Sequence, residues 1–241
     1  MSNANLSNDY SLLSKKTTAY LGEEKRMYVN GAWVLAQSGE TFDTFDPTTS
    51  EVISRVPSAG AVDVDIAVKA ARDAFDHGPW PRLSPADRER RILKLADLLQ
   101  MDGKIFSEIE SVNSGRTLMG TQLFDVDLSV DCLRYMAGWS TKIEGRTINP
   151  SVPYAGPEAK FFSYTTREPL GVIAGITPWN VPLGQSIWKI APALAAGCTI
   201  VLKPAEEASL TTLRFAALLE AADIPPGVCL LYTSPSPRDR G

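Results

Sequence analysis

Apolar residues recur at helical spacing in the first half of the chain and gather into short continuous runs in the second half. Positions i, i+3, i+4 and i+7 are apolar in two stretches, one from Val62 and one after Ser84-Pro85. Gly78-Pro79-Trp80-Pro81 separates the two stretches, and Ser84 is suited to cap the second. The pattern therefore predicts two amphipathic helices here, with further helices over about 103–112 and 120–140.

The second half of the chain alternates apolar runs with helical segments. Gly171–Ile176 and Thr199–Leu202 are short and wholly apolar, which is typical of strands buried on both faces of a parallel sheet. Leu183–Ala196 between them and Leu210–Ala222 after them favour helices. This order predicts a βαβ unit and an α/β fold with a doubly wound, Rossmann-like parallel sheet.

Three other segments have distinct patterns. Asn30-Gly31 between two apolar runs predicts a hairpin. Residues 145–169 are rich in proline, glycine and β-formers and have no helical period, so they predict an extended excursion or long hairpin. Residues 1–26 are polar, and we expect a flexible N-terminus there.

Composition and charge exclude several classes of protein. The 241 residues carry 24 Lys and Arg against 28 Asp and Glu, a net charge of −4, so no basic surface for nucleic acid or anionic lipid is expected. His77 is the only histidine, which argues against a metal site and a Ser-His-Asp triad. The sequence has no apolar run of membrane-spanning length and no C-x-x-C motif, and a cytoplasmic location is the default expectation.

Candidate chemistry follows the two predicted parallel strands. Ligands of open parallel sheets bind beyond the carboxyl ends of the strands, where Thr177–Asn180 and Lys203–Glu206 would lie side by side. The Lys203 ammonium can donate to a ribose diol, and the Glu206 carboxylate can accept from it while repelling a 2′-phosphate, which favours NAD over NADP. The amide of Asn180 can stabilise a developing oxyanion.

Several motifs in this order resemble those of the aldehyde dehydrogenase superfamily. They are Arg167–Asn180 (REPLGVIAGITPWN), Ala191–Gly197 (APALAAG), Lys203–Glu206 (KPAE) and Pro225–Val228 (PPGV), and the resemblance extends upstream through NGAW, FDPTTSEVI, SPADRERRILKLADLL and NSGRT. The resemblance implies NAD-dependent oxidation of an aldehyde to an acid, with Asn180 as the oxyanion-hole amide. It also implies that Lys203 and Glu206 hold the adenosine ribose. Ile176, Thr177, Pro178 and Trp179 would line the cofactor cleft.

The resemblance also divides the chain. Residues 27–140 and 166–228 would form the N-terminal part of the NAD-binding domain, and 141–165 would contact another subunit of a homodimer or homotetramer. Family members continue to a Gly-rich loop, a glutamate base and a cysteine nucleophile, whereas residues 229–241 form a Ser-, Pro- and Arg-rich tail that does not match. Cys132 and Cys198 would be core residues and Cys229 lies in the tail, so we expect a fragment without the catalytic half, inactive on its own.

A second interpretation belongs to another class. The chain could be a non-catalytic nucleotide-binding or interaction module. A Rossmann reductase is disfavoured, because no G-x-G-x-x-G follows a predicted strand.

Overall fold

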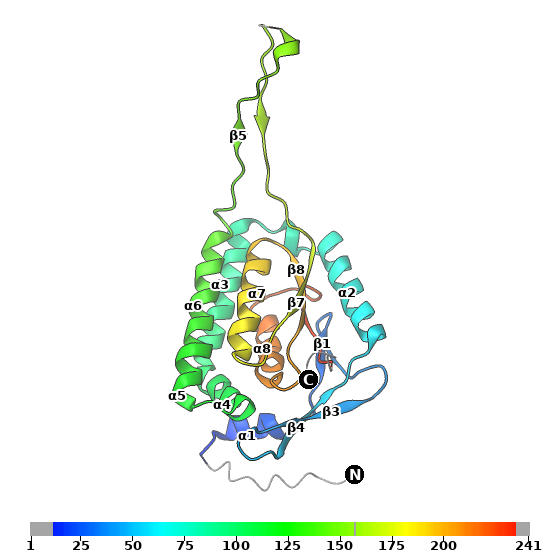
Figure 1. The fold of residues 1–241 in the computed structure, drawn as a ribbon, viewed down its shortest axis with the longest axis vertical. Coiled ribbons are helices and arrows are strands. Elements are labelled where there is room, and N and C mark those ends of the chain that lie inside the picture. The colour runs from blue at the N-terminus through cyan, green and yellow to red at the C-terminus, as the bar shows by residue number, and fades with distance from the viewer. Residues whose placement is uncertain (1–11, 157, 235–241) are drawn as a thin grey trace.

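The computed structural model describes residues 12–156 and 158–234 of the chain, which form a body of helices around a sheet and a long projecting arm (Figure 1). The main sheet has the strand order β2-β1-β9-β8-β7. Its strands are β1 (Met27–Val29), β2 (Ala32–Val34), β7 (Val172–Ile176), β8 (Thr199–Lys203) and β9 (Cys229–Leu231). The last three are parallel, and β1 runs antiparallel to β9.

The turn between β1 and β2 is the predicted hairpin turn. Asn30 and Gly31 have φ angles of 51° and 79°. A two-residue turn of this kind needs positive φ at both positions, which asparagine and glycine tolerate best. The Asn-Gly pair therefore closes the hairpin that its sequence indicates.

Helices cover both faces of the parallel strands. α7 (Pro182–Ala195) and α8 (Leu210–Ala221) connect β7 to β8 and β8 to β9, and they contact one face of the sheet. α2 (Ala61–Asp76) contacts the other face, where Ala67 and Ala71 pack with Val201 and Leu230. The predicted α/β class with a doubly wound parallel core is confirmed.

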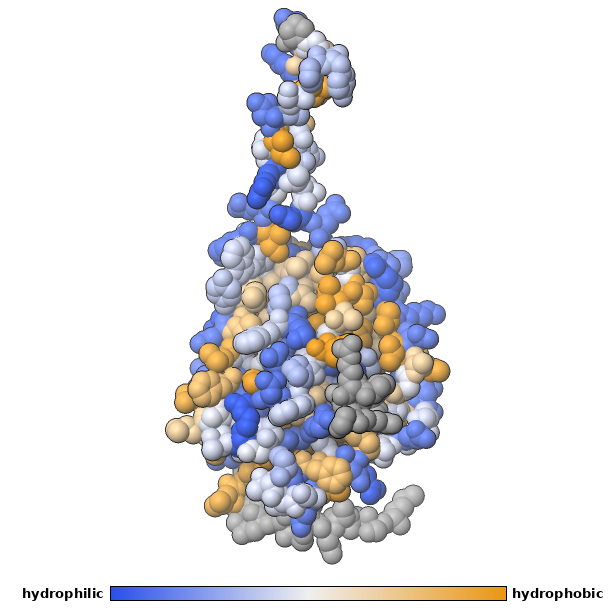
Figure 2. Space-filling model, in the orientation of Figure 1, coloured by the Kyte–Doolittle hydropathy of each residue, from blue (hydrophilic) through white to orange (hydrophobic). Residues whose placement is uncertain are grey.

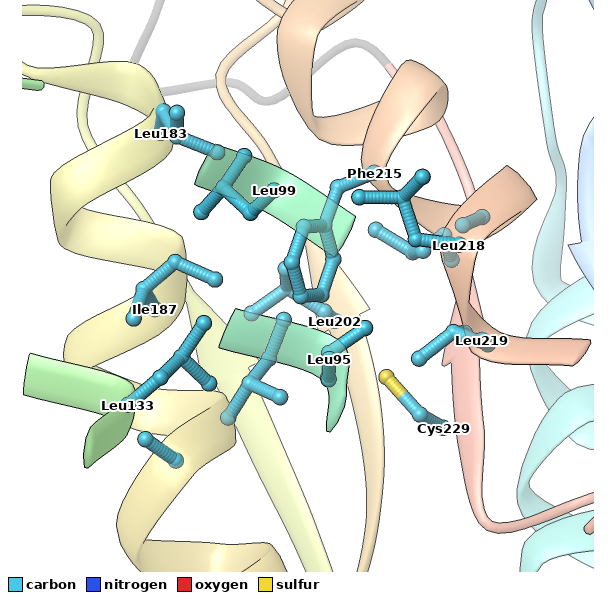
Figure 3. Packing of buried hydrophobic residues seen from close by; sticks show 14 of the residues in the cluster. Leu95, Leu99, Leu133, Leu183, Ile187, Leu202, Phe215, Leu218, Leu219 and Cys229 are labelled. Atoms are coloured by element: carbon cyan, nitrogen blue, oxygen red, sulfur yellow. The ribbon is translucent and has the colours of Figure 1, made fainter. Parts of the chain in front are cut away.

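The larger core lies on the α7 and α8 side of the sheet. Phe215 of α8 is fully buried among leucines from α3, β8 and α8, as Figure 3 shows. Each such side chain contributes about 1.5–3 kcal/mol to folding through removal of apolar surface from water. The helices around this core are α3 (Pro85–Met101), α4 (Gly103–Ser114), α5 (Leu118–Thr121), the π-helical η2 (Gln122–Asp127) and α6 (Leu128–Trp139).

The ends of these helices follow the predicted signals. The Ser84 side chain accepts a hydrogen bond from the Asp87 amide at the start of α3. Gly115 ends α4 in the left-handed region, with φ 69°. The short helix η1 (Trp80–Arg82) lies in the predicted break between α2 and α3.

Two regions differ from expectation, and the first is the N-terminus. α1 (Lys15–Gly22) is a helix with Thr17 and Leu21 buried, and the Ser14 hydroxyl donates to Glu108 of α4 at 2.6 Å. The prediction of a flexible segment over 1–26 is therefore wrong for α1, because a distant buried carboxylate stabilises it. Residues 1–11 lie outside the described part of the chain.

The second difference is at the predicted boundary after Val228. Cys229, Leu230 and Leu231 form β9, pair with β8 and are at most 1% exposed. The prediction that the unrelated tail begins at Cys229 is therefore wrong for this strand, since its apolar side chains pack on both faces of the sheet. Residues 235–241 lie outside the described ranges.

The remaining strands form two small sheets. β3 (Thr41–Phe45) and β4 (Val52–Pro57) make an antiparallel pair beside the body. β5 (Thr147–Ile148), η3 (Pro153–Ala155) and β6 (Ser163–Tyr164) belong to the arm, with β5 antiparallel to β6. The extended excursion predicted for this segment is confirmed (Figure 1).

Candidate cofactor and catalytic site

The carboxyl ends of β7 and β8 lie next to each other. Ile176 is the register partner of Lys203, and the Thr177 amide donates to the Lys203 carbonyl at 3.1 Å. The loop after β7 therefore begins beside the end of β8. This is the adjacency that the strand pattern predicts.

The loop after β7 is mostly exposed. Ile176 and Trp179 are 68% and 60% exposed, and Pro178 and Asn180 are exposed too, whereas Thr177 is buried. The side-chain amide of Asn180 makes no hydrogen bond to any residue within 12–156 or 158–234. An uncharged amide with two free donors is available here to a ligand or a reacting oxygen.

The loop after β8 is mostly buried. Lys203 is only 9% exposed, and its ammonium donates to the Pro204 carbonyl at 3.3 Å. Glu206 is half-buried. A cation and a carboxylate thus occur three residues apart on one short loop.

A cavity of about 530 Å³ receives side chains from both loops. Trp179 and Glu206 line it, opposite residues 42–45 of β3 and the end of α4. The structure therefore brings two of the predicted site residues into one cavity, and it places Ile176, Thr177 and Lys203 at the adjoining strand ends.

Asn113, at the end of α4, is a residue whose role the sequence analysis missed. Its side-chain nitrogen donates to the Glu207 carbonyl at 2.9 Å and to the Thr44 hydroxyl at 3.2 Å, and its side-chain oxygen accepts from the Leu210 amide at 3.2 Å. It therefore ties the loop after β8 to α4 and β3. The available signal is its position on the buried face of α4, seven residues after Phe106.

Glu110 lies three residues earlier on the same face and holds the loop after β7. Its fully buried carboxyl accepts from the Leu183 amide at 3.0 Å and from the Thr211 hydroxyl. Burial, together with the neighbouring Asp125, raises the pKa of Glu110 to about 8, so this group carries a proton at neutral pH. Arg116 pairs with Asp125 at 2.6 Å.

The three cysteines are not placed as reactive thiols. Cys198 and Cys229 are buried near the amino ends of β8 and β9, opposite the edge that carries Lys203. Burial raises the pKa of Cys229 to about 12, and Figure 3 shows its sulfur among apolar side chains. Cys132 is half-buried in α6, and its pKa is also raised by burial. A nucleophilic cysteine needs the opposite shift.

Two kinds of feature are absent from the described ranges. Residues 12–156 and 158–234 contain no cluster of three or more His, Cys, Asp or Glu side chains suited to a metal ion. In the same ranges, no helix is long and apolar enough to cross a membrane.

Comparison with known proteins gives one consistent result. The sequence matches the family model "Aldehyde dehydrogenase family" over residues 33–238, which extends past Val228. Phenylacetaldehyde dehydrogenase of Pseudomonas fluorescens is 43% identical over 86% of this chain and 41% of its own length. "Aldehyde dehydrogenase, cytosolic 1" of Elephantulus edwardii is 44% identical over 86% of this chain and 40% of its own length.

Solved structures agree with the sequence matches. The NAD+ complex of an aldehyde dehydrogenase from Bacillus cereus superposes with a TM-score of 0.87 at 42% identity, over 92% of this chain and 44% of that chain. The chain therefore spans about two-fifths of the length of the curated relatives it matches. With the family match over most of the sequence and the parallel-sheet fold, the comparisons show that the chain belongs to the aldehyde dehydrogenase family.

Proposed function

We propose that this chain provides the cofactor-binding part of an enzyme that oxidises an aldehyde to a carboxylic acid with NAD. The observation that carries the proposal is the junction of the two loops at the carboxyl edge, where Thr177 and Lys203 are hydrogen-bonded. Open parallel sheets bind their ligands at this edge. The NAD+ complex of the Bacillus cereus relative supports the choice of cofactor.

The donor set on the two loops suits a dinucleotide. The Lys203 ammonium is a hydrogen-bond donor that lies beside the Pro204 carbonyl at 3.3 Å, and Glu206 adds a half-buried carboxylate. Together they would hold the hydroxyls of the adenosine ribose. Glu206 opposes a 2′-phosphate, so NAD is favoured and NADP is a weaker alternative. Ile176, Thr177, Pro178 and Trp179 would line the cleft beside them.

Asn180 is proposed as the donor that stabilises charge on the reacting carbonyl oxygen. Its exposed amide has no hydrogen-bond partner among the described residues. The amide can therefore donate to the carbonyl oxygen of a substrate without first losing a hydrogen bond to any of these residues. One oxyanion donor of this kind is worth about 10²–10³ in rate. Bound NAD supplies the hydride acceptor.

The nucleophile and the base are expected outside these 241 residues. Members of the family resembled here use a cysteine and a glutamate; burial raises the pKa of Cys132 and Cys229, and Cys198 is buried at the opposite edge of the sheet, so none of the three suits the role. We therefore expect no NADH formation when this chain is mixed with NAD and an aldehyde. Turnover that disappears in Cys198→Ala would contradict this assignment.

The arm is proposed as a contact between subunits of a cytoplasmic homodimer or homotetramer. Ile148, Phe161 and Phe162 on it are 46%, 51% and 79% exposed, and Figure 2 shows apolar side chains among polar ones along its length. Apolar side chains on so narrow a projection cannot be buried by the body of the same chain. A partner subunit would cover them.

Titration of the chain with NAD+ in a calorimeter tests the cofactor site. We expect binding that weakens several-fold in Lys203→Met, because one ribose contact is lost. Lys94→Met is the matched control, since Lys94 pairs with Asp223 at 2.7 Å on the surface. Absence of binding, or equal weakening by both variants, would contradict the placement of the ribose site.

A further inference from the structure

Three ionisable side chains connect the buried face of α4 to the loop that carries Asn180. Glu110 and Asp125 are neighbours whose carboxyl groups are both fully buried, and Asp125 contributes to the raised pKa of Glu110. Arg116 donates to Asp125 at 2.8 Å, and the same guanidinium nitrogen lies 3.5 Å from the Asn180 carbonyl. The proposed function assigns no role to this Glu110–Asp125–Arg116 chain.

We propose that the Glu110–Asp125–Arg116 chain positions the Asn180 amide, an inference that rests on the role proposed for Asn180 above. The three residues do not touch the reacting atoms. They set where the backbone on both sides of Asn180 can lie. They are therefore positioning residues.

The loop has few hydrogen-bonding groups of its own, which is why outside anchors matter. Pro178 and Pro182 have no N–H group to donate. One end of the loop is fixed by the bond from Thr177 to the Lys203 carbonyl. On the other side of Asn180, the Leu183 amide is fixed by Glu110 at 3.0 Å. Between these two anchored residues, the Arg116 guanidinium contacts the backbone carbonyl of Asn180.

Glu110 holds an amide that the helix cannot satisfy. Leu183 is in the first turn of α7, where backbone N–H groups lack partners within the helix, and α7 has no side-chain cap at Val181. The Glu110 carboxyl replaces that cap from a neighbouring helix. A shift of the Glu110 side chain would therefore shift Leu183 at the start of α7. Asn180, three residues before Leu183, would shift with it.

The geometry of Arg116 also suits a residue that positions the Asn180 loop. Its side chain is 27% exposed and Asp125 is fully buried, so the ion pair connects the interior to the surface loop. A guanidinium is planar and offers several donors in a fixed fork, so it can bind a carboxylate and a carbonyl together. The neutral amide of a glutamine is shorter and cannot reach both.

The test compares Arg116→Gln with Arg214→Gln in the full 241-residue chain. Arg214 is the matched control, because its side chain is 24% exposed and pairs with Asp102 at 2.8 Å in another part of the body. Nuclear magnetic resonance would record the side-chain amide signal of Asn180 and hydrogen exchange at Leu183, with Leu202 in β8 as the internal reference.

We expect Arg116→Gln to shift the Asn180 signal and to speed exchange at Leu183 by about tenfold relative to Leu202, as loss of one charge-assisted hydrogen bond implies. Arg214→Gln should change neither. An unmoved Asn180 signal in Arg116→Gln, or equal changes in both variants, would overturn the proposal, because a purely structural role would affect both alike.

Glu110 variants provide the second arm of the test. Glu110→Gln matches the protonated carboxyl in shape and hydrogen bonding, so Leu183 should stay protected, whereas Glu110→Ala should lose about tenfold in protection. Equal loss in both variants would contradict the role of Glu110. Failure of the parent chain to bind NAD would contradict the proposed function alone, since the Asn180 signal is measured without cofactor.

Discussion

The two loops at the carboxyl edge differ in how they are held. The loop after β8 is buried around Lys203 and tied by two hydrogen bonds to the uncharged side chain of Asn113. The loop after β7 is exposed from Pro178 to Asn180 and reaches the interior through ionisable residues, Glu110 and Arg116. One helix, α4, thus anchors both loops through residues three positions apart.

This difference suits different tasks for the two loops. The buried loop after β8 offers a rigid binding surface, and the exposed loop after β7 offers an accessible amide to a reacting group. A neutral amide fills its hydrogen bonds at modest desolvation cost, so the buried loop is held at any pH. A buried carboxyl pair is sensitive to its proton, so the anchor of the exposed loop depends on pH.

The largest effect is expected from Asn113→Ala. The substitution leaves the buried Leu210 amide without its side-chain partner, and one such unsatisfied group costs about 1–3 kcal/mol, whereas the Glu207 carbonyl still accepts from the Thr44 hydroxyl at 3.2 Å. We expect the free energy of unfolding to fall by about 1–3 kcal/mol, measured by urea denaturation with an unchanged slope. A loss below 1 kcal/mol would show that the loop after β8 is held by other contacts.

The next effect is a pH dependence that Glu110 imposes. Its pKa rises from 4.5 to about 8 on folding, because it is buried beside Asp125, which in turn faces Arg116. Between these values the folded state keeps a proton that the unfolded state loses, so stability falls as pH rises, by up to about 1.4 kcal/mol per pH unit from this group. Below pH 4.5 both states are protonated and the stability from this group is fully present.

Glu110→Gln isolates that contribution. The variant cannot titrate at this position, so the stability difference between parent and variant should move by about 1 kcal/mol in favour of the variant between pH 5.5 and 6.5. Urea denaturation at the two pH values measures it. A difference that is constant with pH would mean that the Glu110 pKa is the same in the folded and unfolded chain.

Local patterns in the sequence predicted the βαβ core, the hairpin at Asn30-Gly31 and the adjacency of the two loops, because wholly apolar runs and turn residues leave few alternatives. The anchors were missed because they depend on distant partners. Asn113 and Leu210 are 97 residues apart, and Glu110 and Leu183 are 73 apart. α1 was missed for the same reason, since its partner Glu108 is 94 residues from Ser14. No local pattern contains such pairs.

A smaller effect is expected at Glu206, on the choice between cofactors. Two unit charges about 4 Å apart interact by roughly 4 kcal/mol at an effective dielectric of 20, before solvent and salt reduce it. If about a quarter of this repulsion energy, about 1 kcal/mol, remains in solution, Glu206→Gln should improve NADP binding relative to NAD roughly fivefold. Calorimetric titration with each cofactor measures the ratio. An unchanged ratio would place Glu206 away from the ribose 2′ position.

The smallest effect is expected from Asn180→Ala on stability. Asn180 is the same residue type as Asn113, but it is exposed and its amide has no hydrogen-bond partner among the described residues, so truncation leaves no buried group unsatisfied. Surface changes of this kind usually alter the free energy of unfolding by less than about 0.5 kcal/mol. The backbone carbonyl near Arg116 is kept, so the loop should also keep its anchor. Urea denaturation of Asn180→Ala beside Asn113→Ala makes the comparison directly. A loss at Asn180 as large as that at Asn113 would mean that the amide supports the fold, and the exposed loop would then not present a free donor to a reacting oxygen.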